Sequence, residues 1–168
     1  PPQLTNRLYS TFDLQDPTNR DRFAMARAGV RMVKDRPLTG LGPDLVKEVY
    51  PEYRDPGAVQ EGNPHLHNVP LQIAAERGLP ALLVWCGFLV LVVRDLIGRL
   101  KDPATKALAA SGLAAVAGML TAGMFEYNFG DSEFLMLFLV LITLPYAFSQ
   151  ESQVAPSIDS AHGLANEE

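Results

Sequence analysis

The sequence LPALLVWCGFLVLVV, residues 79–93, contains no charged side chain. An apolar run of this kind is typical of a membrane-spanning helix, although a complete span needs about 20 residues. Residues 69–78, which precede the run, also have a helical pattern and extend it. We therefore predict a first membrane span at about residues 79–98.

Two further apolar runs follow, and they predict spans at about residues 104–125 and 133–149. The average composition, 48% hydrophobic residues, would suit an ordinary soluble domain, but it hides this partition of the chain. The alternative is that the three runs form buried helices of a soluble bundle. The second run has small residues at helical spacing, which would allow close helix contact in lipid: Ser111, Ala115, Gly118 and Ala122.

Loop charges predict the orientation of these spans. The loop after the first span carries Arg94, Arg99, Lys101 and Lys106, whereas the loop at 126–133 has no Lys or Arg. The positive-inside rule places the first of these loops in the cytoplasm. We therefore predict that residues 1–78 form a periplasmic domain, that residues 79–149 form the membrane part, and that residues 150–168 are a disordered cytoplasmic tail.

The chain does not begin with Met and shows no leader sequence, so we expect it to be the C-terminal part of a longer protein. Its formal net charge of -5 argues against a nucleic-acid partner. Cys86 is the single cysteine and cannot form a disulfide within the chain.

A helix is predicted from about Asn19 to Asp35, with Asp16 or Thr18 as its cap, and Pro37 prevents its continuation. Its apolar stripe is predicted to contain Phe23, Ala26, Val30 and Val33, next to a basic stripe of Arg20, Arg27, Arg31 and Lys34. Arg22 belongs to neither stripe. A place on the flank of the apolar stripe suits a fixed role better than a place on the basic stripe does. The pattern alone nevertheless favours the alternative, that Arg22 only covers apolar surface with its stem.

Residues 37–43, rich in Pro and Gly, predict a turn that cannot continue the helix. A short helix is predicted at residues 44–50. Residues 51–64 predict a long loop, and loops of this length are often functional.

The sequence HLHNVPLQ, residues 65–72, predicts the start of another helix, because Pro70 suits a first turn and His67 or Asn68 suits the cap. A helix N-terminus favours phosphate groups and disfavours a protonated imidazole. His67 should therefore stay neutral, as a general base requires. The alternatives are a purely structural cap and a metal site formed by His65, His67 and Glu61. A serine-hydrolase signature is absent from the sequence.

Three segments resemble O-antigen ligase and O-antigen polymerase-like membrane glycosyltransferases. They are residues 22–43, residues 67–78 with a histidine at the start and a glycine at the end, and residues 128–133. Their order and spacing, together with the predicted spans, extend the resemblance over about residues 4–149.

This resemblance implies an all-α, GT-C-like enzyme of the bacterial inner membrane. It also implies a donor glycan on undecaprenyl diphosphate, an acceptor hydroxyl on lipid A-core or on a growing polysaccharide, and no metal or cofactor. Two alternatives are a protein O-oligosaccharyltransferase of the same superfamily and a non-enzymatic membrane transport or structural subunit.

The resemblance also implies roles for particular residues. His67 corresponds to the catalytic histidine and Arg22 to an arginine that binds the diphosphate. Glu126 is predicted to bind sugar hydroxyls or to orient His67, with helix capping and loop solvation as the alternative. The further substrate-binding candidates are Arg20, Arg36, His65 and Asn68.

Overall fold

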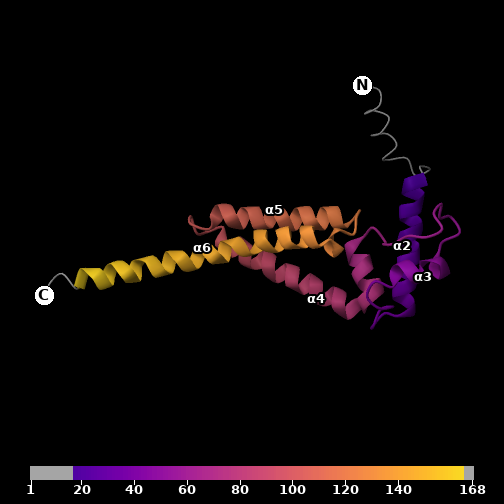
Figure 1. Ribbon diagram of the computed structural model, residues 1–168, viewed down its shortest axis with the longest axis horizontal. Coiled ribbons are helices and arrows are strands. Elements are labelled where there is room, and N and C mark those ends of the chain that lie inside the picture. Colours follow the sequence, from indigo (N-terminus) through magenta and orange to yellow (C-terminus); the bar gives the residue numbers. More distant parts are fainter. Residues whose placement is uncertain (1–16, 165–168) are drawn as a thin grey trace, which may run out of the picture. The chain divides into compact units, whose positions relative to one another are not determined.

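Helices make up all the regular structure that the computed structural model describes, which covers residues 17–164, with side chains from residue 17 to residue 148. Along the chain these elements are α2 (Pro17–Asp35), α3 (Val46–Tyr53), α4 (Val69–Arg99), α5 (Lys106–Gly123), the 3-10 turn η1 (Asn128–Gly130) and α6 (Ser132–Leu164) (Figure 1). No strand occurs in this part of the chain, which confirms the all-α prediction.

The chain divides into two compact units, and each is described by itself. The first contains Pro1–Cys86 and Ala122–Phe129, and the second contains Gly87–Thr121 and Gly130–Glu168. The predicted boundary at residue 78 marks the expected membrane surface. A division into compact units does not test that surface, so the boundary stays a prediction.

A hydrophobic core holds the first unit together. Its buried members are Met25, Ala28, Met32, Val46, Tyr50, Leu66 and Ala75. They come from α2, from α3 and from the chain around the start of α4, so these elements pack as one body. Each large side chain removed from water contributes about 1.5–3 kcal/mol to folding.

The helices of this unit begin and end close to their predicted positions. Helix α2 spans Pro17–Asp35, which confirms the helix predicted from about residue 19 to residue 35. The short helix begins at Val46 instead of Asp44 and ends at Tyr53. Asp44 has a φ of 61°, a left-handed conformation that a helix cannot include, and this explains the later start. Asp16, one of the two predicted caps, lies outside the described residues.

The predicted apolar stripe of α2 is wrong. Phe23 is 52% exposed and Val30 is 45% exposed. The buried face instead carries mostly small or flexible side chains: Ala24, Met25, Ala28, Gly29 and Met32. A Cβ at Gly29 would lie 2.7 Å from the Leu71 side chain, so the close approach of α4 selects this face. Hydrophobic periodicity alone does not detect a contact that depends on small residues.

The turn at residues 37–43 closes over the end of the helical segment 69–77. The amides of Leu41 and Gly42 donate to the carbonyls of Ala75 and Glu76, both at 2.9 Å. These bonds satisfy carbonyl groups that a helix end leaves without partners. Backbone hydrogen bonds therefore join the turn at residues 37–43 to the helical segment 69–77, on either side of the loop predicted at residues 51–64.

Gly78 kinks α4, with φ 82° and ψ 170°. The first part, residues 69–77, belongs to the core of the first unit, and the apolar part begins at residue 79. We predicted that residues 69–78 extend the span; they are helical, but the kink separates them from it. Pro80 is tolerated because it lies in the first turn after the kink, where a helix amide has no partner to lose.

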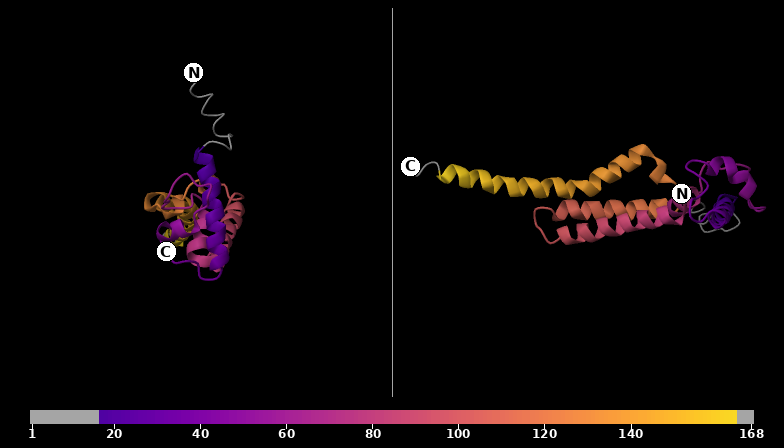
Figure 2. Two further views of the ribbon diagram at one scale, coloured as in Figure 1. Left: turned by 90° about the vertical axis from the view of Figure 1, so that its right-hand side faces the viewer. Right: turned by 90° about the horizontal axis from the view of Figure 1, so that it is seen from below.

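The second unit contains the C-terminal part of α4, most of α5 and α6, which Figure 2 shows as long helices. Val69–Arg99 and Lys106–Gly123 are long and apolar enough to cross a membrane. The third predicted span corresponds to a shorter apolar helix, Ser132–Phe148, so two of the three predicted spans meet this criterion among the described residues.

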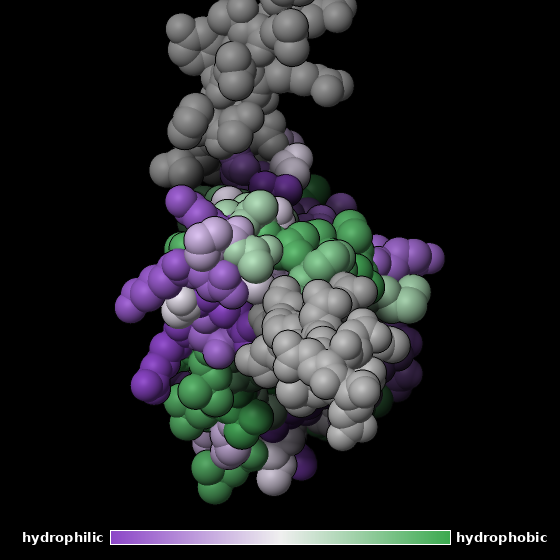
Figure 3. All heavy atoms as spheres, turned by 90° about the vertical axis from the view of Figure 1, so that its left-hand side faces the viewer, coloured by the Kyte–Doolittle hydropathy of each residue, from purple (hydrophilic) through white to green (hydrophobic). Residues whose placement is uncertain are grey.

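The apolar side chains of these helices point largely outward. Only 11% of the most apolar window of α4 is buried, and Val84 is 74% exposed. Figure 3 shows hydrophobic side chains, drawn green, on the surface of the face that it presents. A core helix of a soluble protein would bury this surface, whereas lipid can cover it. This favours membrane spans over the soluble bundle.

The small residues predicted to form a contact face of α5 are not the residues that pack most closely in the described structure, and their contact with other helices in lipid stays a prediction. Ser111 and Gly118 are exposed, and nothing lies within 4 Å of a Cβ built at Gly118. The buried face is instead formed by Ala109, Gly112, Val116, Met119 and Gly123. A Cβ at Gly112 would lie 3.1 Å from the Leu96 side chain and 3.3 Å from the Leu141 carbonyl, so this glycine permits the close packing.

Helix α6 continues to Leu164, whereas we predicted disorder from residue 150. Alanine, glutamine and glutamate in this segment are compatible with a helical backbone, although the segment has few large apolar residues. Side chains after Phe148 and residues 165–168 lie outside the described part of the chain. The cytoplasmic location of this segment stays a prediction.

Candidate functional site

His67 lies immediately before the start of α4 in an unusual backbone conformation. Its φ is 48°, which is uncommon for a residue with a side chain. Asn68 provides the helix cap, because its Oδ1 accepts a hydrogen bond from the Leu71 amide at 2.9 Å. The capping role therefore belongs to Asn68, and the imidazole of the preceding residue is not needed for it.

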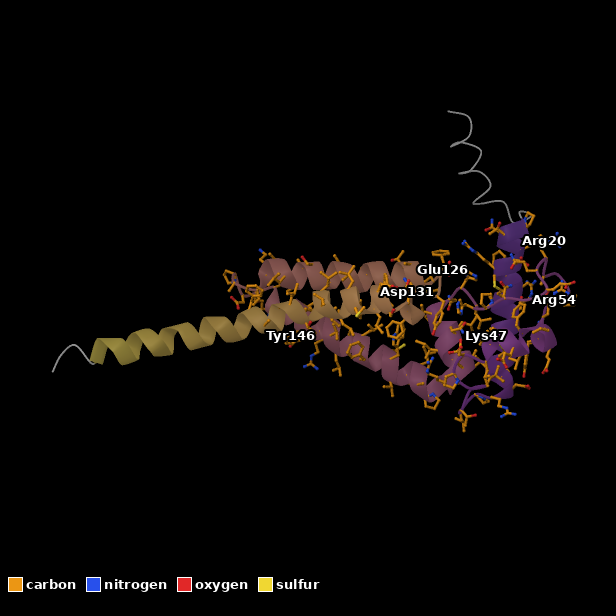
Figure 4. The ribbon with its side chains drawn as sticks, in the orientation of Figure 1. Arg20, Lys47, Arg54, Glu126, Asp131 and Tyr146 are labelled. Carbon is orange, nitrogen blue, oxygen red and sulfur yellow. The ribbon has the colours of Figure 1, made fainter. Side chains whose placement is uncertain are left out.

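Glu126 contacts the His67 ring. The distance from His67 Nδ1 to Glu126 Oε1 is 2.8 Å, and the two side chains are 30% and 57% exposed. Glu126 lies between α5 and η1 (Figure 4), and the same segment is tethered because Asn68 Nδ2 donates to the Met124 carbonyl at 3.2 Å. When Nδ1 carries the proton of this contact, Nε2 presents a lone pair, which is the form that accepts a proton.

The Glu126 carboxyl is held in its charged form. Partial burial raises the pKa of this carboxyl. Hydrogen bonds from the Tyr127 amide and the His67 ring lower the pKa, the charge of Arg22 lowers it as well, and together they outweigh the effect of burial. The net result is a pKa below the ordinary value. A stable carboxylate beside the imidazole follows from this arrangement.

Arg22, His67 and Glu126 line one cavity of about 300 Å³. This is at the lower end of the size range of small-ligand pockets. The other lining residues are Pro17, Thr18, Asp21, Met25, Val59, Gln60 and Asn63. All of them belong to the first unit. The structure thus brings together the three predicted site residues that matter most for the proposed chemistry.

The arginines of α2 divide into two kinds. Arg27 Nε lies 2.8 Å from Asp55 Oδ2, and Arg31 also contacts this carboxylate at 3.4 Å. The hydrogen bond from Arg27, with one from the Gly57 amide, holds the pKa of Asp55 well below its ordinary value. Arg22, by contrast, forms no hydrogen bond or ion pair with the residues that the structure describes. Among the described residues, its guanidinium acts on Glu126 through its charge alone.

The loop after α3 forms one wall of the cavity, and Asp21 positions it. Asp21 is only 6% exposed, and its Oδ1 accepts hydrogen bonds from the amides of Val59 at 2.6 Å and Gln60 at 3.2 Å. On the other side, Arg54 Nε donates to the Gln60 carbonyl at 3.0 Å. The predicted long loop therefore has a defined position next to His67.

A buried polar network supports the chain just before His67. The Leu66 amide donates to Gln72 Oε1, and Gln72 Nε2 donates to Glu76 Oε1, both at 2.8 Å. Glu76 is 3% exposed and pairs with Arg77 at 3.0 Å. Since buried polar groups are costly to leave unpaired, this network restricts the backbone that carries the imidazole.

Four predicted substrate-binding residues do not line the cavity: Arg20, Arg36, His65 and Asn68. Arg20 lies on the first turns of α2 (Figure 4), and Arg36 follows the far end of that helix. The His65 ring lies 5.1 Å from the Tyr127 ring, centroid to centroid. Within the described part of the chain, no group of three His, Cys, Asp or Glu residues is placed to hold a metal ion.

Sequence reasoning missed Asp21, Gln60 and Asn63. A signal for Asp21 existed, because it continues the buried face of α2 at helical spacing from Met25 and Ala28. Because the prediction assigned burial to the face of Phe23 and Val30, it did not identify Asp21 as a buried residue. Gln60 and Asn63 lie in irregular chain, where side-chain direction follows from tertiary contacts and not from a sequence period.

Comparison with known proteins gave one result. A family model described as O-antigen ligase matches residues 2–86, a segment that contains both Arg22 and His67. No curated protein and no solved structure matches the chain.

Proposed function

Because the chain belongs to the O-antigen ligase family, we propose that it transfers a glycan from undecaprenyl diphosphate to an acceptor hydroxyl at the outer side of the inner membrane. The acceptor is a sugar hydroxyl of lipid A-core or of a growing polysaccharide. The observation that carries the proposal is the shared cavity of Arg22, His67 and Glu126. This cavity combines the Arg22 guanidinium, a cation that can bind phosphate, with the His67 imidazole, a base that can accept a proton from a hydroxyl.

His67 is the proposed general base. Its Nε2 takes the proton of the acceptor hydroxyl while the oxygen attacks the anomeric carbon of the donor sugar. The bond from this carbon to the diphosphate oxygen breaks, and the diphosphate leaves with the electron pair. The products are the extended acceptor, undecaprenyl diphosphate and a protonated His67.

Arg22 is the proposed ligand of the diphosphate. A guanidinium grips phosphate oxygens with two parallel hydrogen bonds, which suits a leaving group that gains negative charge. Arg22 has no partner that a substrate would have to displace among the described residues. The diphosphate is already a good leaving group, so charge stabilisation and positioning supply the remaining acceleration.

Glu126 is proposed to orient the His67 ring and to stabilise the imidazolium that forms. Its carboxylate lies 2.8 Å from Nδ1, the ring nitrogen away from the proposed reaction. A carboxylate in this position fixes the useful tautomer of the histidine and balances its charge after proton uptake. The alternative role, direct binding of sugar hydroxyls, is the less favoured because this contact already engages Oε1.

His67→Ala tests the proposal in the full protein. We expect glycan transfer to be abolished in a deletion strain that carries the variant, while the protein still accumulates in the membrane. His65→Ala is the matched control, because His65 does not line the cavity, and it should retain transfer. Transfer that persists in His67→Ala would remove the base assignment and with it the proposed mechanism.

A further inference from the structure

Asn63 has a buried amide nitrogen that finds no hydrogen-bond partner among the described residues. The residue is 5% exposed, and its Nδ2 makes no hydrogen bond within the described structure. Buried amides are nearly always paired, because an unpaired donor loses its hydration without compensation. The same residue lines the cavity of Arg22 and His67, so the unpaired amide belongs to the cavity wall.

The loop that carries Asn63 is held firmly. Asp21 accepts the amides of Val59 and Gln60, and the Arg54 Nη2 donates to the Ala58 carbonyl at 3.0 Å. These contacts fix the chain a few residues before Asn63. The unpaired amide is therefore a defined feature of the cavity wall, and such pre-organisation lowers the entropy lost on binding.

The charges around the cavity indicate what it accepts. Among its described lining residues are two carboxylates, those of Asp21 and Glu126, and one guanidinium, that of Arg22. A diphosphate held entirely inside would face more negative than positive charge, which disfavours it. An uncharged, polyhydroxylated ligand avoids this repulsion and offers both donors and acceptors. An amide matches such a ligand because it donates and accepts through one planar group.

We propose that the inner part of this cavity is the acceptor-sugar subsite and that Asn63 positions the acceptor by hydrogen-bonding a hydroxyl next to the one that reacts. The assignment rests on the proposed function, since it takes His67 as the base. It places the acceptor sugar between the amide and the imidazole and leaves the diphosphate to the Arg22 side.

Kinetics of the full protein with Asn63→Leu test this subsite. We expect the KM for the acceptor to rise about tenfold, which corresponds to the loss of about one hydrogen bond. The KM for the lipid-linked donor should stay within twofold. The melting temperature without substrate should not fall, because leucine removes a buried amide that had no partner. A residue with only a structural role would not give this combination.

Asn128→Leu is the matched control. Both polar atoms of the Asn128 amide are buried and have no hydrogen-bond partner among the described residues. Asn128 belongs to the same unit as Asn63, but it does not line the cavity. We expect this variant to keep the acceptor KM of the wild type. Asn63→Asp keeps the shape of the side chain and replaces the donor by a carboxylate oxygen, so it should raise the acceptor KM as Asn63→Leu does. If Asn63→Leu does not accumulate in the membrane, Asn63→Asp is measured in its place.

An unchanged acceptor KM in Asn63→Leu or Asn63→Asp would overturn the subsite, as would an equal rise in Asn128→Leu. A rise in the donor KM alone would also overturn it, by assigning the amide to the diphosphate. These results are separate from the test of the proposed function. If His67→Ala abolishes transfer while the Asn63 variants leave acceptor binding unchanged, the subsite fails and the glycosyltransferase proposal stands.

Discussion

At the scale of single residues, His67 combines a strained backbone with a charged neighbour. A residue other than glycine with φ near 48° costs about 1–3 kcal/mol, and such conformations persist where surrounding contacts enforce them. Here the cap of Asn68 and the contact with Glu126 are those contacts. The imidazole lines the cavity, which is consistent with the role proposed for it.

Glu126→Gln should lower the kcat of glycan transfer about tenfold at neutral pH. The amide keeps the shape of the side chain but cannot balance the positive charge that His67 gains. The loss is expected to be smaller than in His67→Ala, because general-base catalysis itself contributes about 10²–10⁴-fold. A kcat equal to that of the wild type would show that the Glu126 contact has no part in the reaction.

Glu126→Gln should also change how the stability of the protein depends on pH. The pKa of Glu126 is lowered in the folded protein, so its favourable contacts are present above the ordinary pKa of about 4.3 and are lost as the pH falls through the lowered value. We expect the difference in melting temperature between wild type and Glu126→Gln to be constant near neutral pH and to shrink below about pH 4. A difference that grows on acidification would contradict this assignment.

At the scale of elements, the turn at residues 37–43 and the kink at Gly78 form one interlocked junction. Leu79 donates its amide to the Pro37 carbonyl at 2.7 Å, directly after the kink. A Cβ at Gly78 would lie 2.3 Å from the Leu38 carbonyl oxygen, and a Cβ at Gly40 would lie equally close to the backbone of Glu76. Both glycines also have positive φ, a conformation that residues with a Cβ rarely adopt. The junction therefore needs glycine at both positions, for lack of space and for backbone conformation.

Gly78→Ala should destabilise the protein by about 1–3 kcal/mol, through backbone strain and the clash with Leu38. Gly87→Ala is the control, because it lies in the same helix with nothing within 4 Å of its Cβ position. That variant should melt at or slightly above the temperature of the wild type, since alanine favours a helix over glycine. Equal melting temperatures for both variants in detergent would contradict the interlocked junction.

At the scale of the whole molecule, the chain is a membrane protein whose apolar helices follow a polar domain. The orientation proposed for it depends on the charges of the loops, with Arg94, Arg99, Lys101 and Lys106 on the cytoplasmic side. The loop after α5 has no Lys or Arg and carries Glu126. The proposed mechanism requires this second loop to face the compartment where the glycan is transferred.

Cysteine labelling tests the orientation. In a Cys86→Ala background, a membrane-impermeant maleimide added from the outer side should label Gly130→Cys and should not label Pro103→Cys. Both positions are exposed and uncharged, so the substitutions leave the loop charges unchanged. Labelling of both positions would mean that α5 does not cross the membrane. The reverse pattern would place His67 and Glu126 in the cytoplasm.

The sequence alone predicts the helices from α2 to α5 and the interruption at Pro37, and it points to Arg22 and His67 as the residues on which the proposed chemistry depends. Each of these follows from local properties: the hydrophobicity of a run, the missing amide of a proline, or a short motif. The match of residues 2–86 to the O-antigen ligase family agrees with that motif evidence.

Packing in three dimensions fixes which faces of α2 and α5 are buried, and it brings Glu126, Asp21 and Asn63 into one cavity with His67. Burial depends on which neighbour approaches, and small residues such as Gly29 and Gly112 permit approaches that hydrophobicity does not predict. Contacts between distant segments arise from packing in three dimensions, and no periodicity along one segment contains that information.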